Sequence, residues 1–80
     1  MVTSTEPAAA SLVRHCLQQL EQCVPMASHQ LGEIHLLEPH SDFSPQQHCD
    51  ALDSLIERGV LAAYRYIEAV PNAAILAVRA

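Results

Sequence analysis

Histidine and cysteine are the residues of this chain best suited to chemistry, with five histidines and three cysteines in the sequence. Such side chains bind zinc when they recur at short paired spacings, C-x2–4-C together with H-x3–5-H. Most of these residues have a different spacing, His29-x5-His35-x4-His40-x7-His48-Cys49. Because no pair of closely spaced cysteines accompanies the histidines, we predict no metal site and no cofactor, with the histidines on the surface.

Nucleophilic catalysis by a thiol needs an activated cysteine beside a histidine base. The pair His48-Cys49 is the candidate, because it lies near the start of a predicted helix. Cys49 nevertheless shares the apolar side of that helix with Leu52 and Ile56, so we interpret it as a packing residue. Two glycines are also too few for the Gly-rich loops that bind phosphates. We therefore predict that the protein is not an enzyme.

The three cysteines are predicted to be reduced and to pack in the core. Cys16 and Cys23 lie seven residues apart on a predicted helix, a rise of about 10.5 Å, whereas a disulfide needs Cα atoms within about 7 Å. The N-terminal residues show neither the basic start nor the apolar run of a signal peptide. These features predict a cytoplasmic protein without a membrane-spanning segment.

The charge balance is acidic, with nine acidic and four basic residues and a formal net charge of −5. Nucleic-acid binding depends on several Lys or Arg side chains that neutralise phosphates. Anionic membranes require similar basic clusters. We therefore predict that neither is a partner, and that a protein with a basic surface fits better. Protonation of all five histidines would raise the formal charge from −5 to 0, so association can respond to acid.

Two helices are predicted from apolar residues at steps of three and four. The first covers residues 7–24 and ends before Pro25. The second covers residues 45–58 and begins with a capping box, in which Ser44 caps the helix and Gln47 lies three residues later. Arg58 and Gly59 end it, since a cation suits the terminal carbonyls and glycine adopts the left-handed turn that follows.

Short strands are predicted for residues 33–38 and on either side of a turn at Pro71-Asn72, over residues 60–70 and 73–79. The fold class is therefore α+β, in the order helix–strand–helix–strand–strand. Two helices cover one face of a small three-stranded sheet, and the strands flanking the second helix run parallel. The alternative is a small all-α bundle, because the many alanines of the last third also favour helix. Residues 1–6 are predicted to be a flexible leader, and 7–80 a single small domain.

The predicted hairpin separates its residues into two faces. A two-residue loop pairs Tyr66 with Ala77 and Tyr64 with Arg79, which places these four with Glu68 on one face. We predict that this face is exposed, because Tyr and Arg are common at binding hot spots. The face predicted to lie under the helices carries Leu61, Ala63, Ile67, Ala69, Ala74, Leu76 and Val78, with Arg65 as the one residue that does not fit there.

These features predict a small acidic, non-catalytic protein that acts by protein–protein interaction, as a regulator, inhibitor or accessory subunit. The predicted partner-binding residues are the hairpin residues Tyr64, Tyr66, Glu68 and Arg79, together with an acidic helix face of Asp50, Asp53 and Glu57. An open sheet edge also makes a homodimer plausible.

Two alternatives stay open. One is a winged-helix-like regulator that binds nucleic acid, because a helix, a glycine and a hairpin end the chain. Against it, residues 41–58 supply one helix where a helix-turn-helix needs two. The other alternative is a metal-handling protein that uses its histidines and cysteines.

Overall fold

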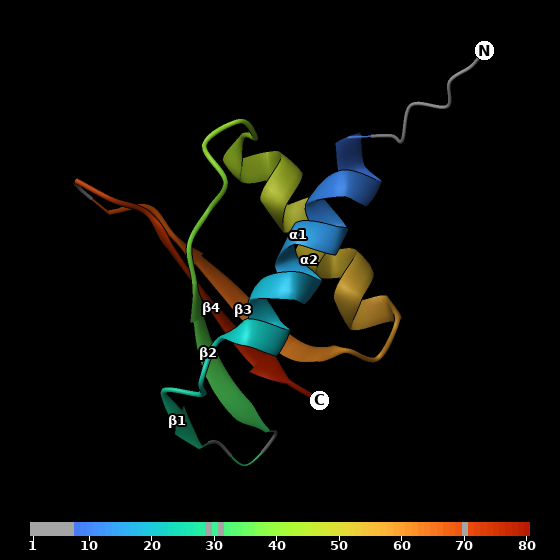
Figure 1. Ribbon diagram of the computed structural model, residues 1–80, viewed down its shortest axis with the longest axis vertical. Helices are drawn as coiled ribbons and strands as arrows, with labels where there is room; N and C mark the ends of the chain where they lie inside the picture. The colour runs from blue at the N-terminus through green and yellow to red at the C-terminus, as the bar shows by residue number, and fades with distance from the viewer. Residues whose placement is uncertain (1–7, 29, 31, 70) are drawn as a thin grey trace.

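In the residues that the structure describes, the chain forms two helices and four strands in the order α1–β1–β2–α2–β3–β4 (Figure 1). A computed structural model describes residues 8–28, 30, 32–69 and 71–80. The predicted leader, residues 1–6, lies outside this range. The helices are α1 (Ala8–Gln22) and α2 (Pro45–Glu57), and the strands are β1 (Ala27–Ser28), β2 (Glu33–Leu37), β3 (Leu61–Ile67) and β4 (Ala74–Arg79). The predicted α+β class is confirmed, with β1 as an additional short strand.

The start of α2 follows the predicted capping box. The Ser44 side chain accepts a hydrogen bond from the Gln47 backbone N–H at 3.2 Å, and the Gln47 side chain accepts one from the Ser44 N–H at 2.8 Å. These two bonds satisfy amides that the first helical turn cannot bond internally. At the other end, Gly59 has a φ of 77°, which is the left-handed conformation predicted for it.

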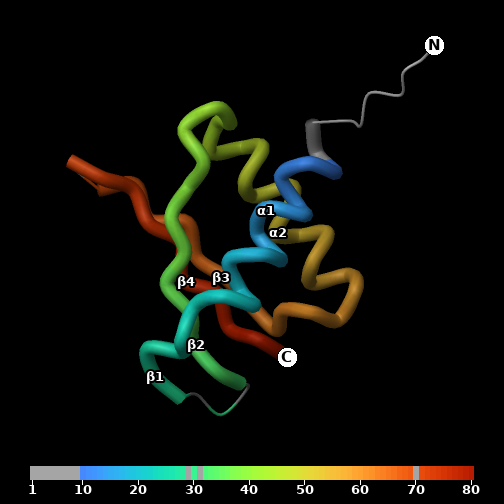
Figure 2. The backbone as a smooth tube through the Cα atoms, viewed as in Figure 1, coloured from blue at the N-terminus to red at the C-terminus, as the bar shows by residue number. Residues whose placement is uncertain are grey.

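The sheet is antiparallel throughout, with strand order β1-β2-β4-β3. Because β4 runs antiparallel to both β2 and β3, those two strands share one direction, as predicted. However, β4 lies between them, so the crossover through α2 spans two strand positions. Both helices lie on one side of the sheet, and the chain path in Figure 2 shows the same separation into layers.

The core lies between the helices and the inner face of the sheet. The two helices contribute Leu12, Val13, Cys16, Leu20, Ala51, Leu52 and Leu55, and the sheet contributes Leu37, Leu61, Ile75 and Ala77. A β-bulge between Leu61 and Ala63 rotates the start of β3, so that Leu61 faces inward opposite Arg79. The inner face is therefore set by alternation in β2 and β4 and by this bulge in β3.

The predicted hairpin pairing is wrong by two residues. Tyr64 pairs with Ala77 and Tyr66 with Ile75, instead of with Arg79 and Ala77. A shift of two residues keeps the same side chains together on a face. The larger error concerns which face lies under the helices, because Ile75 and Ala77 are buried and both tyrosines pack against the core.

The physical reason for this reversal is the size of the tyrosine ring. A buried Tyr removes far more apolar surface from water than an alanine, and its hydroxyl can still find a polar partner. Ala77 lies between His35 on β2 and Tyr64 on β3 in one row of the inner face. Its small side chain leaves room for the two rings beside it.

Candidate interaction surface

Tyr64 connects the sheet to α2 and is not part of an exposed surface. Its hydroxyl lies 2.8 Å from the Asp53 carboxylate and 3.2 Å from the Cys49 carbonyl oxygen, and it donates its proton there. Burial, together with the hydrogen bond to Asp53, raises the pKa of Tyr64 above its usual value. Tyr64 and Tyr66 were predicted to bind a partner, but their rings contribute to the inner face instead.

The acidic residues of α2 lie on its solvent side, as predicted. Asp50, Asp53 and Glu57 are all exposed. Asp50 accepts a hydrogen bond from the Gln46 side chain at 3.0 Å, and Asp53 is held by Tyr64. Of the three, Glu57 therefore has the least constrained carboxylate among the described contacts.

The two remaining predicted residues lie apart from this helix. Glu68 is exposed just after β3, where the hairpin projects beyond the helices (Figure 1). Arg79 is half-buried at the end of β4, opposite Leu61. The predicted site residues are thus not brought together into one surface.

Instead, the structure exposes the sheet face that sequence reasoning placed under the helices. We call it the outer face, and its paired residues are Ile34, Leu36, Ala63, Arg65, Ile67, Ala74, Leu76 and Val78. Cross-strand partners share one face, and these alternate with the buried Leu37, Ile75 and Ala77. In the described part of the chain neither helix lies over this face (Figure 1).

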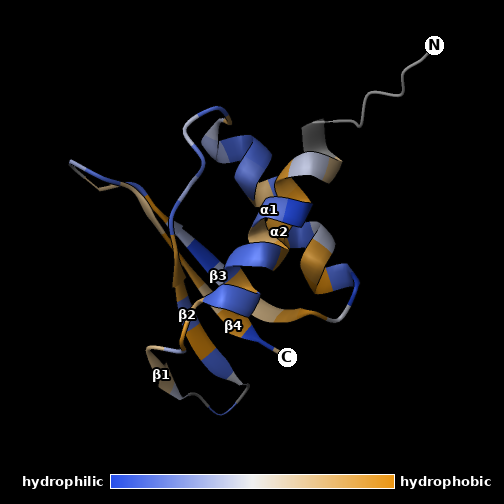
Figure 3. Ribbon diagram, in the orientation of Figure 1, coloured by the Kyte–Doolittle hydropathy of each residue, from blue (hydrophilic) through white to orange (hydrophobic). Residues whose placement is uncertain are grey.

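The outer face is apolar apart from one side chain. Its strands are coloured as hydrophobic over much of their length in Figure 3. Leu36 is 50% exposed near the middle of β2, and Arg65 is exposed on β3 in the same row, with Leu76 between them. Among the paired residues just named, Arg65 is the sole charge. A contiguous apolar patch of this kind on a small protein commonly marks a binding surface.

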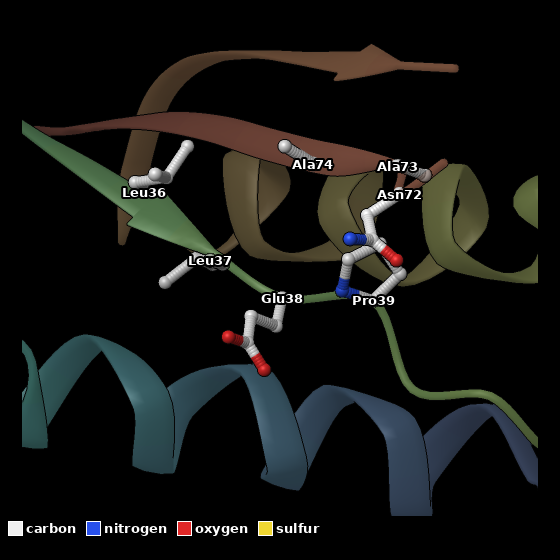
Figure 4. A pocket seen from close by; sticks show the side chains of 7 residues that line it. All are labelled: Leu36, Leu37, Glu38, Pro39, Asn72, Ala73 and Ala74. Carbon is white, nitrogen blue, oxygen red and sulfur yellow. The ribbon is translucent and has the colours of Figure 1, made fainter. Parts of the chain in front are cut away.

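A surface cavity of about 480 Å³ adjoins one end of the outer face. Its walls come from the end of β2 and the start of β4, and they comprise Leu36, Leu37, Glu38, Pro39, Asn72, Ala73 and Ala74. Figure 4 shows Leu36 and Leu37 on opposite sides of β2, with Leu37 on the side of α1. The Glu38 carboxylate and the Asn72 amide add an acceptor and a donor at the rim.

A cluster of aromatic rings lies on the other side of the sheet, and it corrects the prediction that the histidines are on the surface. His48 is buried on the first turn of α2, next to Phe43 and Tyr66. His40 stacks edge-on against His15 and Phe43, with ring centroids 4.9 and 5.2 Å away. The missed signal is local, because Phe43 and His48 occupy the two positions of a hydrophobic staple.

His35 is the second buried histidine. Its ring is 2% exposed on the inner face, and neither ring nitrogen has a hydrogen-bond partner among the described residues. The Glu33 carboxylate, 3.8 Å from Nε2, is beyond hydrogen-bond distance and largely exposed. Alternation with Leu37 in β2 is the sequence pattern that places it inward.

The cysteines are free thiols, as predicted. Cys16 is buried, and burial raises its pKa to about 11. Cys23 and Cys49 are partly buried. Within the residues that the structure describes, no three His, Cys, Asp or Glu side chains form a group that could hold a metal ion.

No protein-family model, curated protein or solved structure matches this chain. Its class is therefore given by its own geometry: an α+β fold in which one sheet face packs against the helices and the other has no helix over it among the described residues. In the described ranges no helix has both the length and the apolar character needed to cross a bilayer.

Proposed function

We propose that this protein is a small acidic binding module that uses the outer face to contact another protein. The observation that carries this proposal is the continuous apolar surface across β2, β4 and β3, without a helix over it in the described chain. Full burial of a Leu or Ile side chain contributes about 1.5–3 kcal/mol. Several such residues in adjacent rows give a partner enough apolar area to bind.

The size of the outer face favours a reversible complex. Strands about 4.8 Å apart and rows about 6.8 Å apart give three strands and three rows an area on the order of 300 Å². A stable interface buries about 800 Å² on each partner. Because the outer face alone is smaller than this, we expect the contact to extend to the neighbouring cavity beside Leu36 and Asn72 and the complex to be reversible.

Charge identifies the chemistry of the partner. Arg65 is the one charge in the defined set, and no ion pair is formed by it among the described residues. In a second copy the same set offers no carboxylate to receive it. A different protein, with an apolar surface that carries an Asp or Glu, satisfies both the apolar face and the guanidinium. This partner differs from the basic one predicted for the α2 carboxylates.

A homodimer through the sheet edge receives less support. β3 lies at one edge of the sheet and carries a bulge at its start and Arg65 in its middle. β1 lies at the other edge and has two residues. Bulges, charges and short strands are the features by which proteins protect sheet edges from pairing. Self-association through the outer face would therefore contradict the proposal.

The test is capture of partners by the intact chain, with variants on opposite sides of the molecule. We expect Leu36→Asp to abolish capture of a protein that the original chain binds in stoichiometric amounts, and Arg65→Glu to weaken it strongly. Glu57→Gln, on the far side, is the matched control and should bind as before. Circular dichroism establishes that each variant is folded.

Three results would contradict the proposal. The first is equal capture by the original chain and Leu36→Asp. The second is loss of capture in Glu57→Gln, which would assign the interface to α2. The third is a concentration-dependent dimer in light scattering that disappears in Leu36→Asp, since it would make a second copy the occupant.

Nucleic-acid binding is the second candidate, and the observation that favours it is the β3–β4 hairpin directly after α2. Its weakness is charge, because the solvent side of α2 carries Asp50, Asp53 and Glu57 and would repel phosphates. A mobility-shift assay at low salt tests it. Salt-dependent binding would favour it, and absence of a shift would exclude it.

A further inference from the structure

The aromatic cluster beside α2 contains a titratable group that holds a loop in place. The loop is the connector between β2 and α2, residues 38–44, and the group is His48 on the first turn of α2. His48 Nε2 accepts a hydrogen bond from the His40 backbone N–H at 2.8 Å. Its Nδ1 lies 2.8 Å from the Ser44 carbonyl oxygen. The imidazole therefore bridges two points of the connector.

These contacts fix the protonation state of the ring. A backbone N–H can only donate, so Nε2 must be without a proton, and a carbonyl oxygen can only accept, so Nδ1 must carry one. The bonded form is therefore the neutral Nδ1–H tautomer. A second proton on Nε2 would remove the acceptor and set two N–H groups against each other inside a buried site.

We propose that His48 is an acid-sensitive latch: its protonation breaks the bond to His40 and releases the connector between β2 and α2. This inference is independent of the proposed binding function, because it concerns the opposite side of the sheet and a different set of residues. Histidine is the residue type whose side chain, when unperturbed, changes its charge between about pH 5 and 8.

The other described hydrogen bonds of the connector lie within it or at its two ends, at Glu38 and Ser44. The Phe43 N–H donates to the His40 carbonyl within the connector at 3.1 Å, and Phe43 packs against the core. From α1, the Gln19 side chain donates to the Glu38 carbonyl at 3.2 Å, and the His15 ring packs edge-on against the His40 ring. Loss of the His48 bond thus leaves the middle of the connector without a hydrogen bond to α2 among the described contacts.

The connector and the elements packed against it carry several charged and titratable groups. They are Arg14 and His15 from α1, His40 and Asp42 from the connector, Cys49 from α2, and Tyr66 from β3. Asp42 is exposed, and its carboxylate lies 3.9 Å from His40 Nδ1, so it gives little compensation to a buried cation. The cluster is otherwise rich in groups that gain positive charge in acid.

Repulsion between the rings of this cluster makes additional positive charge unfavourable while the connector is in place. Burial, reinforced by the charges of His40 and His48, lowers the pKa of His15. A cavity of about 230 Å³ beside these rings gives the connector room to move. Its walls are formed by Ser11, Arg14, His15, Gln18, His40 and Phe43.

The experiment is NMR of the intact, nitrogen-15-labelled chain, titrated from pH 7.5 downward until the His48 ring nitrogens show the doubly protonated form. At pH 7.5 the imidazole nitrogen shifts should show His48 as the neutral Nδ1–H tautomer. As His48 gains its second proton, we expect the exchange protection of the His40 amide to fall about tenfold, as for the loss of one hydrogen bond. The amides of Leu52 and Leu55 should keep their protection.

Two variants separate this latch from general acid unfolding. His48→Gln keeps an acceptor near the position of Nε2 without a titratable proton, and should make His40 amide protection independent of pH. His40→Gln keeps the backbone N–H and removes the neighbouring ring, and should preserve the response.

Several outcomes would overturn the proposal. One is an Nε2–H tautomer of His48 at pH 7.5, a measurement that needs no variant. Another is unchanged His40 protection while His48 becomes protonated. A third is simultaneous loss of protection at His40, Leu52 and Leu55, which would show global unfolding. A response that persists in a folded His48→Gln variant would assign the sensor to another group.

Discussion

The Tyr64 hydroxyl donates a hydrogen bond to the Asp53 carboxylate across the boundary between β3 and α2, at 2.8 Å. This bond joins a residue predicted to lie on an exposed hairpin face to one predicted to lie on an exposed helix face. It forms because the tyrosine ring packs against the core while its hydroxyl reaches the edge of the helix. The contact therefore shows that the face carrying Tyr64 is the one that meets the helices.

Tyr64→Phe should lower the free energy of unfolding by about 0.5–1.5 kcal/mol, because it removes this hydrogen bond and keeps the ring. Chemical denaturation at pH 7 measures the change. Tyr66→Phe is the matched control, since no hydrogen bond of the Tyr66 hydroxyl is among the described contacts, and its effect should be smaller. An equal or larger loss in Tyr66→Phe would contradict this role for Tyr64.

The same bond predicts instability in alkali. The pKa of Tyr64 is raised in the folded chain. Its contribution to the free energy of unfolding is therefore complete below the ordinary tyrosine pKa of about 10. It is lost as the pH rises from there toward the folded value. Stability measured from pH 8 upward should therefore fall more steeply in the original chain than in Tyr64→Phe, and parallel curves would exclude the linkage.

The assignment of inner and outer faces can be tested on neighbouring leucines. Leu37 is 1% exposed and Leu36 is 50% exposed. Leu37→Ala should therefore cost about 2–5 kcal/mol, through lost burial and a residual cavity. Leu36→Ala should cost about 1 kcal/mol or less. Thermal or denaturant unfolding compares the two, and the reverse order would show that the outer face is covered.

The parts of the fold that were predicted correctly depend on short-range chemistry. Ser44 and Gln47 determine a helix start within four residues, and Gly59 ends the same helix because its backbone tolerates a positive φ. The surface depends instead on long-range packing. Alternation separates Tyr64 from Arg65, but it cannot say which of the two faces meets the helices.

The bulge near Ala62 explains part of this difficulty. Counted by strict alternation, Leu61 belongs with Ala63 and therefore with the outer face. The register shift between Leu61 and Ala63 turns Leu61 inward. Strict alternation therefore adds Leu61 to the apolar residues of the outer face, although its side chain faces the helices. The burial of His48 was missed for a different reason, because histidine is usually polar surface and here it completes a staple with Phe43.

The two glycines should differ in their tolerance of alanine. At Gly32 the φ is 157°, and an added Cβ would collide with the Arg79 carbonyl of β4. That backbone is fixed in the sheet, so Gly32→Ala must displace the β1–β2 end or the end of β4. At Gly59 an added Cβ meets no atom within 4 Å, and the strain comes from its φ of 77° alone.

We therefore expect Gly59→Ala to cost about 1–2 kcal/mol, the usual penalty for a left-handed residue with a side chain. Gly32→Ala should cost more, because a steric collision is added to unfavourable backbone angles. Denaturant unfolding of the two variants gives the comparison. Equal stability losses would show that the Arg79 backbone moves away without difficulty.

Acid should destabilise the fold partly through His15. Its pKa is lowered first by burial and then by the charges of His40 and His48, so the folded chain favours the neutral ring. The unfolded chain binds this proton at the ordinary value of about 6.5. The contribution of His15 to stability is therefore complete above that pH, and it is lost as the pH falls through the pKa of the folded state.

His15→Gln, which cannot titrate, should show a shallower decline in unfolding free energy between pH 7 and 5. Gln22→Ala changes an exposed position on the same helix without altering the charge of the cluster, and should keep the original steepness. Identical slopes in the original chain and His15→Gln would refute a role for His15 and leave the acid response to the other rings of the cluster.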